Sequence, residues 1–399
     1  MTGRLVAMLA LFGMVSIPAS ATPPGPNGKL VFNCPATPDP NGGVTEAICT
    51  MNPDGTGYTK IIDGGGINAQ AVWSPDGTKI AFSSSRNSTP PVLGSFGGDI
   101  WVVNADGSNP IQLTHSSTDG SPAWSADGRL AFTSFRDHID DHSFTSSIYV
   151  MNADGSNQHA VTTVDTVTFD TEPAWSPDGK RIAFIRSDQL QRGAGIDGGF
   201  EEIYTVNDDG SNLQQLTVVP DFIATYGVSK DHPTWSPDGT RIAFIESPWL
   251  DFDLAGYIVG VVNADGSDEH FLTRNSDSPA GLDILDVVWS PDGTLLAGTC
   301  SYTTLPGARM CLIEAATGEI TGPIGPAGFA VYPDWGRAPA PTNPAIAGTE
   351  KSPSAAGCPK CTMSPISSDS ASTRTPTPPM TRNAIVTALM RPPLVGLRG

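Results

Sequence analysis

The sequence WSPDG, residues 73–77, recurs along the chain and decides its fold. It stands again at residues 175–179, 235–239 and 289–293, and residues 124–128 read WSADG. Proline fixes φ at the second position of a tight turn, aspartate bonds to nearby backbone amides, and glycine takes up a φ that other residues resist. Each copy therefore predicts a strand that ends in a tight turn.

Each turn is followed by runs that are typical of further strands. A run such as IAF, residues 80–82, comes first, and a third run ends in a second turn that reads NADG at residues 104–107. A short fourth run often closes the unit, as in QLT at residues 112–114. Aliphatic and aromatic runs of this length suit half-buried strands. Units of four strands, with 46 to 60 residues between the first-strand tryptophans of successive units, are typical of propeller blades.

The two ends of the repeated region complete each other. Residues 29–32, KLVF, match the second strand of a unit, and residues 332–335, YPDW, match a first strand with nothing after it. We therefore predict an all-β fold, a six-bladed β-propeller of four-stranded antiparallel blades. One C-terminal strand and three N-terminal strands would close the ring, which removes exposed sheet edges.

The five copies of the turn and the IAF-like strand after it resemble the WD40-like (PD40) repeat of the TolB-like β-propeller family. The resemblance covers about residues 27–336. It implies a protein- or ligand-binding module of the periplasm or cell envelope. The implied partner is an envelope protein or peptide at the channel mouth, such as the peptidoglycan-associated lipoprotein (Pal).

The N-terminal residues have the pattern of an export signal. Arg4 precedes an apolar run over residues 5–17, and ASA at residues 19–21 offers a cleavage site. We expect residues 1–21 to be a cleavable signal peptide and the protein to be periplasmic or secreted. The alternative is an N-terminal core strand or helix. No later segment approaches the twenty apolar residues that a membrane span needs, so none is expected.

The cysteines agree with an oxidising compartment. Cys34 and Cys49 lie in one repeat, and Cys300 and Cys311 lie at the equivalent place in another. Disulfides are the favoured interpretation, and metal ligation is the alternative. Residues 337–399, which contain Cys358 and Cys361, are rich in Pro, Ser and Thr and are expected to be a disordered tail.

Charge is divided unevenly along the chain. Residues 27–336 hold 39 acidic and 14 basic side chains, a net charge of −25, whereas residues 337–399 carry +5. A body this acidic repels nucleic acid and anionic lipid and attracts cations or a basic partner.

One candidate site is the channel that the first strands would line. Three residues before each tryptophan stand polar side chains, namely Gln70, Ser121, Glu172, His232, Asp286 and Tyr332. They could hold a cation, a peptide or a small polar ligand, and a water-filled channel is the alternative. No cofactor is required. Ca²⁺ is a candidate, but it needs six to eight oxygen ligands, more than Glu172 and Asp286 provide.

Two loops hold further candidates. One gathers carboxylates and imidazoles that could bind a divalent metal, Asp137, His138, Asp140, Asp141 and His142. A solvated polar loop is the alternative interpretation. In the other loop, Trp249 and Phe252 could contact a sugar or peptide, or pack on a neighbouring blade.

Motifs of catalysis are missing from the sequence. It contains no G-x-S-x-G elbow, no H-E-x-x-H and no phosphate-binding glycine loop. No catalytic residue is assigned, and a binding module is favoured. The alternative is a propeller enzyme, such as a metal-dependent polysaccharide lyase or hydrolase. The six histidines are scattered, however, and only His232 falls at a channel position.

Overall fold

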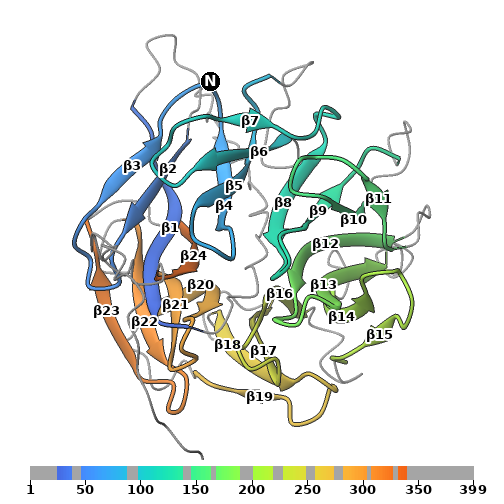
Figure 1. Cartoon of the computed structure of the whole chain (residues 1–399). Helices are drawn as coiled ribbons and strands as arrows, with labels where there is room; N and C mark the ends of the chain where they lie inside the picture. Colours follow the sequence, from blue (N-terminus) through green and yellow to red (C-terminus); the bar gives the residue numbers. More distant parts are fainter. Residues whose placement is uncertain are drawn as a thin grey trace, which may run out of the picture. The chain divides into compact units, whose positions relative to one another are not determined.

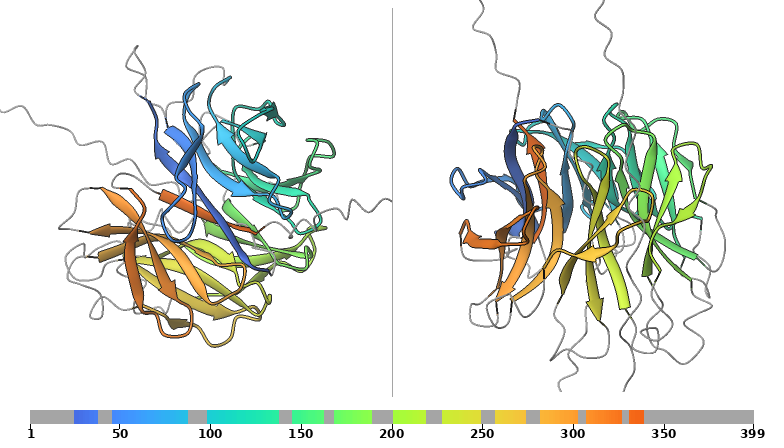
Figure 2. Two further views of the ribbon diagram at one scale, coloured as in Figure 1. Left: turned by 60° about the vertical axis from the view of Figure 1, so that its left-hand side comes forward. Right: turned by 90° about the horizontal axis from the view of Figure 1, so that it is seen from below.

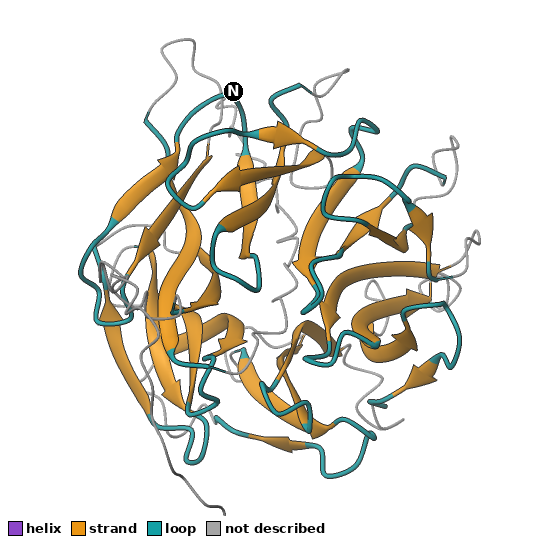
Figure 3. Cartoon of the chain, in the orientation of Figure 1, coloured by secondary structure: helices purple, strands orange, loops and turns teal. Residues whose placement is uncertain are grey.

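The described part of the chain forms strands and turns. The computed structural model describes residues 25–37, 46–87, 98–137, 145–162, 168–188, 201–218, 228–248, 257–273, 282–302, 307–326 and 331–338. All of these residues belong to one compact unit, Met1–Pro341. None of them belongs to the second unit, Thr342–Gly399. Within these ranges there are 24 strands and no helix (Figure 3), hence no helix able to cross a membrane.

The strands between residues 27 and 160, together with the C-terminal strand, form three sheets of four strands each. The first, in spatial order, consists of β24 (Val331–Arg337), β1 (Asn27–Pro35), β2 (Glu46–Met51) and β3 (Thr59–Ile62). The second consists of β4 (Asn68–Trp73), β5 (Lys79–Ser84), β6 (Asp99–Asn104) and β7 (Ile111–Gln112). The third consists of β8 (Asp119–Trp124), β9 (Leu130–Ser134), β10 (Ser147–Met151) and β11 (His159–Ala160).

The remaining strands form one sheet of eight and one of four. The eight-stranded sheet begins with β12 (Thr168–Trp175), β13 (Arg181–Asp188), β14 (Glu201–Asn207) and β15 (Gln214–Gln215). It continues with β16 (Val228–Trp235), β17 (Arg241–Pro248), β18 (Ile258–Asn263) and β19 (His270–Phe271). The last sheet consists of β20 (Leu282–Trp289), β21 (Leu295–Tyr302), β22 (Ala308–Glu314) and β23 (Ile320–Ile324).

The sheets follow one another around a centre, with β4, β8, β12, β16, β20 and β24 innermost (Figure 1). Every pairing inside a four-strand unit is antiparallel, as predicted. The eight-stranded sheet arises because one parallel pair, Glu201 with Ser229, connects β14 to β16. The last strand pairs with the first, with Leu30 opposite Trp335, so β24 lies beside β1 (Figure 2).

The repeated turns form as the sequence predicts. Gly77 adopts a φ of 68°, and its N–H donates to the carbonyl of Ser74 at 2.9 Å. The carboxylate of Asp76 accepts hydrogen bonds from the Ser74 hydroxyl (2.7 Å) and the Thr78 N–H (3.0 Å). These bonds hold the pKa of Asp76 below its usual value, although partial burial works the other way.

The core lies between neighbouring four-strand units. One buried cluster combines Trp175 of β12, Phe184 of β13 and Trp235 of β16, each fully buried. The indole N–H of Trp235 donates to the carbonyl of Ala174 at 3.1 Å, which ties β16 to β12. Each unit therefore buries its apolar side chains only when the next unit is in place.

Replacing Phe184 by Ala is expected to destabilise the fold by about 3–5 kcal/mol, because it removes a fully buried ring and leaves a cavity. Denaturant unfolding followed by tryptophan fluorescence measures this. Leu213→Ala is the control, since Leu213 is 45% exposed and should change stability by less than about 0.5 kcal/mol. Equal effects of the two substitutions would contradict this assignment of the core.

Candidate functional site

The six residues predicted to line the channel occupy equivalent positions in the innermost strands (Figure 1). Each lies three residues before the tryptophan of its strand, which ends the strand in every case but β24. The side chains of Gln70, Ser121, Glu172, His232 and Asp286 are buried, and Tyr332 is partly exposed. The structure thus brings these six positions together, as predicted, and ligand binding by them stays a prediction.

The backbone at these positions is unusual. Five of the six residues have a left-handed φ between 53° and 62°, and none of the five is glycine: Gln70, Ser121, Glu172, His232 and Tyr332. The ladders of β4, β8, β12 and β16 shift register at this point, which marks a β-bulge. A left-handed non-glycine residue costs about 1–2 kcal/mol and needs compensation from its surroundings.

Hydrogen bonds between neighbouring four-strand units supply that compensation. The side chain of Gln70 accepts the N–H of Ser121 at 2.6 Å, across from the second sheet to the third. Glu172 accepts the N–H of His232 at 2.8 Å.

The same contact recurs where the chain ends meet. Asp286 accepts the N–H of Tyr332, also at 2.8 Å. At two positions another strand of the preceding unit provides the acceptor. The Asn33 side chain accepts the N–H of Gln70, and the Thr133 hydroxyl accepts the N–H of Glu172, both at 3.2 Å. The sequence located these positions but did not reveal that their side chains hold adjacent sheets together.

Burial raises the pKa of the carboxyl groups in this ring. The pKa of Glu172 lies well above its usual value, and that of Asp286 rises to about 6, in both cases chiefly because the groups are desolvated. Asp334 behaves in the same way, and its pKa rises to about 7. It accepts the N–H of Trp73 at 2.7 Å, so it connects β24 to β4.

A second acidic group lies where β14 and β16 meet. The hydroxyl of Ser229 donates to Glu201 and lies 3.2 Å from Oδ2 of Asp231. Burial and, after it, the negative charge of Glu201 raise the pKa of Asp231 well above its usual value. Sequence analysis missed Glu201 and Asp231, because their proximity depends on the parallel pair between Glu201 and Ser229, which are 28 residues apart in the sequence.

Farther from the axis, three sheets carry an arginine stacked on an aromatic ring. Arg186 donates to both carboxylate oxygens of Asp170, at 2.6 and 2.7 Å, and lies 5.4 Å from the ring centre of Tyr204. Arg136 binds Asp119 at 2.6 Å and stacks on Tyr149 in the same way. In the second sheet the arginine is Arg86, which stacks on Trp101 and binds Asn68.

The equivalent positions in the other sheets use different chemistry. In the fifth four-strand unit the charges are exchanged, because Lys230 of β16 stands opposite Glu246 of β17. Lys230 is 2% exposed and lies 3.3 to 3.7 Å from the carboxylates of Glu202, Glu246 and Glu269.

In the first and last sheets, disulfides stand at the positions that the arginines and their aromatic partners occupy in other sheets. Cys34–Cys49 and Cys300–Cys311 are both present in the structure, as predicted. Cys49 stands opposite Phe32, where Tyr204 stands opposite Phe184. Cys358 and Cys361 lie outside the described residues.

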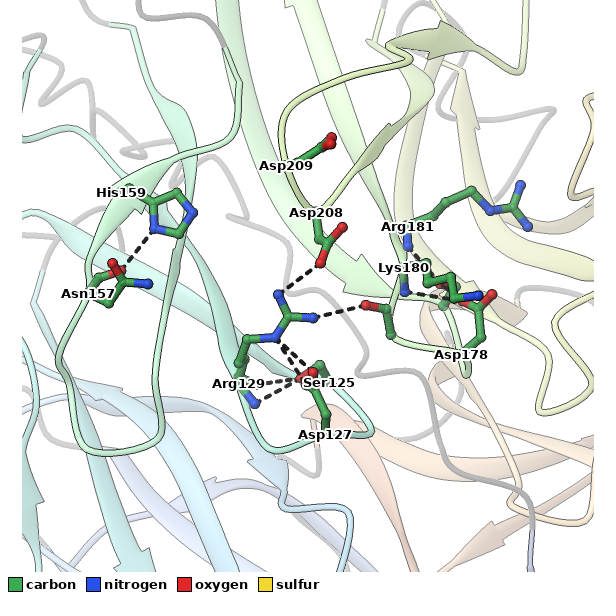
Figure 4. A network of polar contacts seen from close by, with 12 residues as sticks. Ser125, Asp127, Arg129, Asn157, His159, Asp178, Lys180, Arg181, Asp208 and Asp209 are labelled. Carbon is green, nitrogen blue, oxygen red and sulfur yellow. Dashed lines mark hydrogen bonds and ion pairs between the residues drawn. The ribbon is translucent and has the colours of Figure 1, made fainter.

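The repeated turns are joined by a polar network (Figure 4). Arg129 of the third sheet binds Asp127 within its own turn and reaches Asp208 and the carbonyl of Gly179, each at 3.0 Å. Its guanidinium also stacks over Trp175 at 4.8 Å. These contacts give the arginine a structural role between sheets.

The predicted loop candidates fall mostly outside the described residues. This applies to His138, Asp140, Asp141 and His142, and to Trp249 and Phe252. Asp137 is described, and it accepts a hydrogen bond from the hydroxyl of Tyr149. In the part of the chain that can be described, no group of three or more His, Cys, Asp or Glu side chains is placed to hold a metal ion.

Comparisons with known proteins agree with this architecture. Residues 125–247 match the family model of the dipeptidyl peptidase IV (DPP IV) N-terminal region. A TolB homologue from Chlorobium luteolum is 28% identical over 173 residues, 43% of this chain and 32% of that protein. TolB from Acinetobacter baumannii superposes with a TM-score of 0.58 at 18% identity, over 78% of this chain and 67% of that one. In its repeats and its fold the chain resembles the TolB-like β-propellers.

Another relative shares only a segment with this chain. The uncharacterized peptidase YuxL from Bacillus subtilis is 42% identical over 72 residues, which are 18% of this chain and 9% of that peptidase. The chain thus covers 9% and 32% of the lengths of these two curated relatives. Whole-protein activities of the relatives are therefore not carried over.

Stability is expected to fall as pH rises from about 5 to about 7. Asp334 binds its proton more tightly in the folded state, at a pKa of about 7, than in the unfolded chain, so folding takes up a proton between pH 4 and 7. For this group alone the loss from pH 5 to pH 7 is about 2 kcal/mol. Unfolding of the wild type and Asp334→Asn across this range measures it, since the variant should show a flatter dependence. An unchanged slope would contradict the assignment.

Arg186→Ala is expected to destabilise the protein by about 3–5 kcal/mol, because Asp170 is fully buried and would lose both guanidinium bonds. The matched control is Arg337→Ala at the exposed end of β24. Chemical denaturation of both variants tests this, and similar midpoints would disprove a special role for the buried pair.

Proposed function

We propose that this chain is an exported binding module and that residues 27–336 form a six-bladed, ring-closed propeller. In this interpretation residues 1–21 are a cleaved signal peptide, and the protein is periplasmic or secreted. The predicted tail begins within β24, which includes Arg337, and its residues from 339 onward lie outside the described residues. The eight-stranded sheet counts as two blades, because a single parallel pair joins two antiparallel four-strand units. The pairing of β1 with β24 supports closure of the ring.

The observation that carries the proposal is the concentration of carboxyl groups around Tyr332. Besides burial, the negative charges of Asp286, Glu46, Glu172 and Asp231 raise the pKa of this phenol. These acids come from four different strands and surround the partly exposed tyrosine. Such a centre attracts positive charge, in agreement with the net charge of −25 over residues 27–336.

The proposed partner is an envelope protein or peptide with a basic segment, bound at the channel mouth. A Pal-like lipoprotein is the first candidate, by analogy with the TolB-like family. Ca²⁺ is a candidate companion ion, because carboxylate oxygens are its preferred ligands. The function needs neither nucleic acid nor a membrane span.

A second candidate is a propeller enzyme, such as a metal-dependent polysaccharide lyase or hydrolase. Two observations support it: the 42% identity to a segment of YuxL, which is named as a peptidase, and the match of residues 125–247 to the N-terminal region of dipeptidyl peptidase IV. Turnover of glycans or peptides by the purified protein with added divalent metal would establish it.

Affinity capture from native envelope extract, with and without a chelator, tests the binding module. We expect one stoichiometric partner, weakened at least tenfold in Glu172→Gln/Asp286→Asn, since the double variant removes two charges but keeps acceptors for the N–H groups of His232 and Tyr332. Asp265→Asn, in an exposed turn, is the control. Dependence on the chelator would support Ca²⁺. Finding no partner under any condition would overturn the proposal.

A further inference from the structure

The carboxyl groups of Asp231 and Glu201 share one hydroxyl. Ser229 Oγ donates to Glu201 and lies 3.3 and 3.2 Å from the two carboxylate oxygens of Asp231. The hydroxyl has a single proton, so it cannot donate to both groups at once. Burial and the negative charge of Glu201 raise the pKa of Asp231, so the pair favours a state in which one carboxyl group is protonated.

Titratable groups on several strands surround this pair. Glu172 of β12 repels it, and Asp231 in turn raises the pKa of Glu172. Tyr257, just before β18, and Tyr332 of β24 also have their pKa values raised by the charge of Asp231. The Ser247 side chain of β17 acts in the opposite direction and lowers the pKa of Asp231.

The two basic side chains of β16 near the pair have other contacts. Lys230 is held by Glu202, Glu246 and Glu269. The ring of His232 lies 6.2 Å from that of Tyr332.

An independent observation points to a ligand at the same place. Ser187 of β13 stands opposite Glu201 in the β13–β14 ladder, so its side chain projects from the same face of the sheet. Its hydroxyl is 1% exposed and has no hydrogen-bond partner among the described residues. A buried hydroxyl without a partner costs about 1–3 kcal/mol, which a bound donor or acceptor would recover.

We propose that Ser187, Glu201, Ser229 and Asp231 bind a primary ammonium group, such as a lysine side chain of the partner, in exchange for the proton that the empty pair holds. This inference rests on the proposed binding function and adds the chemical class of the ligand and its dependence on pH. An ammonium group has three donors on a compact centre, which suits acceptors arriving from β13, β14 and β16. A planar guanidinium suits a single bidentate carboxylate instead.

The exchange keeps the local charge constant. The O–H bond of the shared proton breaks, the proton passes to the buffer, and the ammonium brings an equal positive charge to the same carboxylates. Affinity must therefore rise with pH in the range where the empty pair is protonated, and about one proton is released for each ammonium bound.

Infrared difference spectroscopy of the full-length protein at pH 7 tests for the proton without any ligand. Subtracting the Glu201→Gln or Asp231→Asn spectrum from that of the wild type should leave the C=O stretch of a protonated carboxyl. Glu319→Gln, an exposed glutamate, should leave only carboxylate bands. Carboxylate bands alone from both pair variants would overturn the proposal.

Titration calorimetry with C-terminally amidated trilysine, in two buffers of different ionisation enthalpy, tests the exchange. We expect release of about one proton per bound peptide in the wild type, tighter binding at pH 7.5 than at pH 5.5, and weaker binding of triarginine. Ser187→Ala should weaken trilysine binding about tenfold without unfolding the protein. Glu319→Gln should behave as the wild type.

Each outcome separates this inference from the binding function. Absence of trilysine binding, or binding without proton release, overturns the ammonium site even if an envelope partner is captured. Proton-linked trilysine binding supports the site even if the envelope extract yields no partner, in which case only the identity proposed for the partner fails.

Discussion

The ring depends on one recurring contact between neighbouring four-strand units. In it, a backbone N–H of an innermost strand donates to a side chain of the preceding unit. The donor residue has a left-handed φ that is unfavourable for residues such as Glu172 or Tyr332. Its N–H is satisfied only if the neighbouring sheet is present to accept it. Local conformation and ring assembly therefore stabilise each other, and neither is expected to persist alone.

These bonds place carboxyl groups where they are costly as well as useful. Glu172 and Asp286 accept backbone N–H groups from inside the protein, and burial raises the pKa of both. A charged acceptor forms a stronger hydrogen bond than a neutral one, but desolvation opposes its ionisation. The same side chains thus hold the ring together and concentrate negative potential at its centre. Only isosteric substitutions can separate these two roles.

The sequence predicts much of this fold because its turns and tryptophans report local geometry. The WSPDG turns fix where strands end, and the apolar runs that follow them, such as residues 80–82, mark the buried second strands. The disulfides were also predictable, since Cys34 and Cys49, like Cys300 and Cys311, fall at equivalent positions of a hairpin.

Features that depend on contacts between separate units could not be predicted in this way. The parallel pair between Glu201 and Ser229 joins two hairpins whose own patterns carry no sign of it. The proximity of Asp231 to Glu201, and the position of Ser187 beside them, follow from that pair. The use of Gln70 as an acceptor for Ser121 likewise depends on the sheet-to-sheet arrangement, which a polar residue in a strand does not reveal.

The outer cross-links show why the two disulfides stand where they do. In three sheets the second and third strands of a unit are connected by an arginine that stacks on an aromatic ring, and in one unit Lys230 lies among glutamates at the equivalent place. The first and last sheets use disulfides, and they share a buried cluster that contains Trp335, Leu30 and Val288. This is where the two ends of the chain meet, so its contacts close the longest loop and cost the most chain entropy. A disulfide in each of these two sheets lowers the conformational entropy of the unfolded chain. It thereby favours closure of the ring at the place where non-covalent contacts alone would have to offset the largest loss of chain entropy.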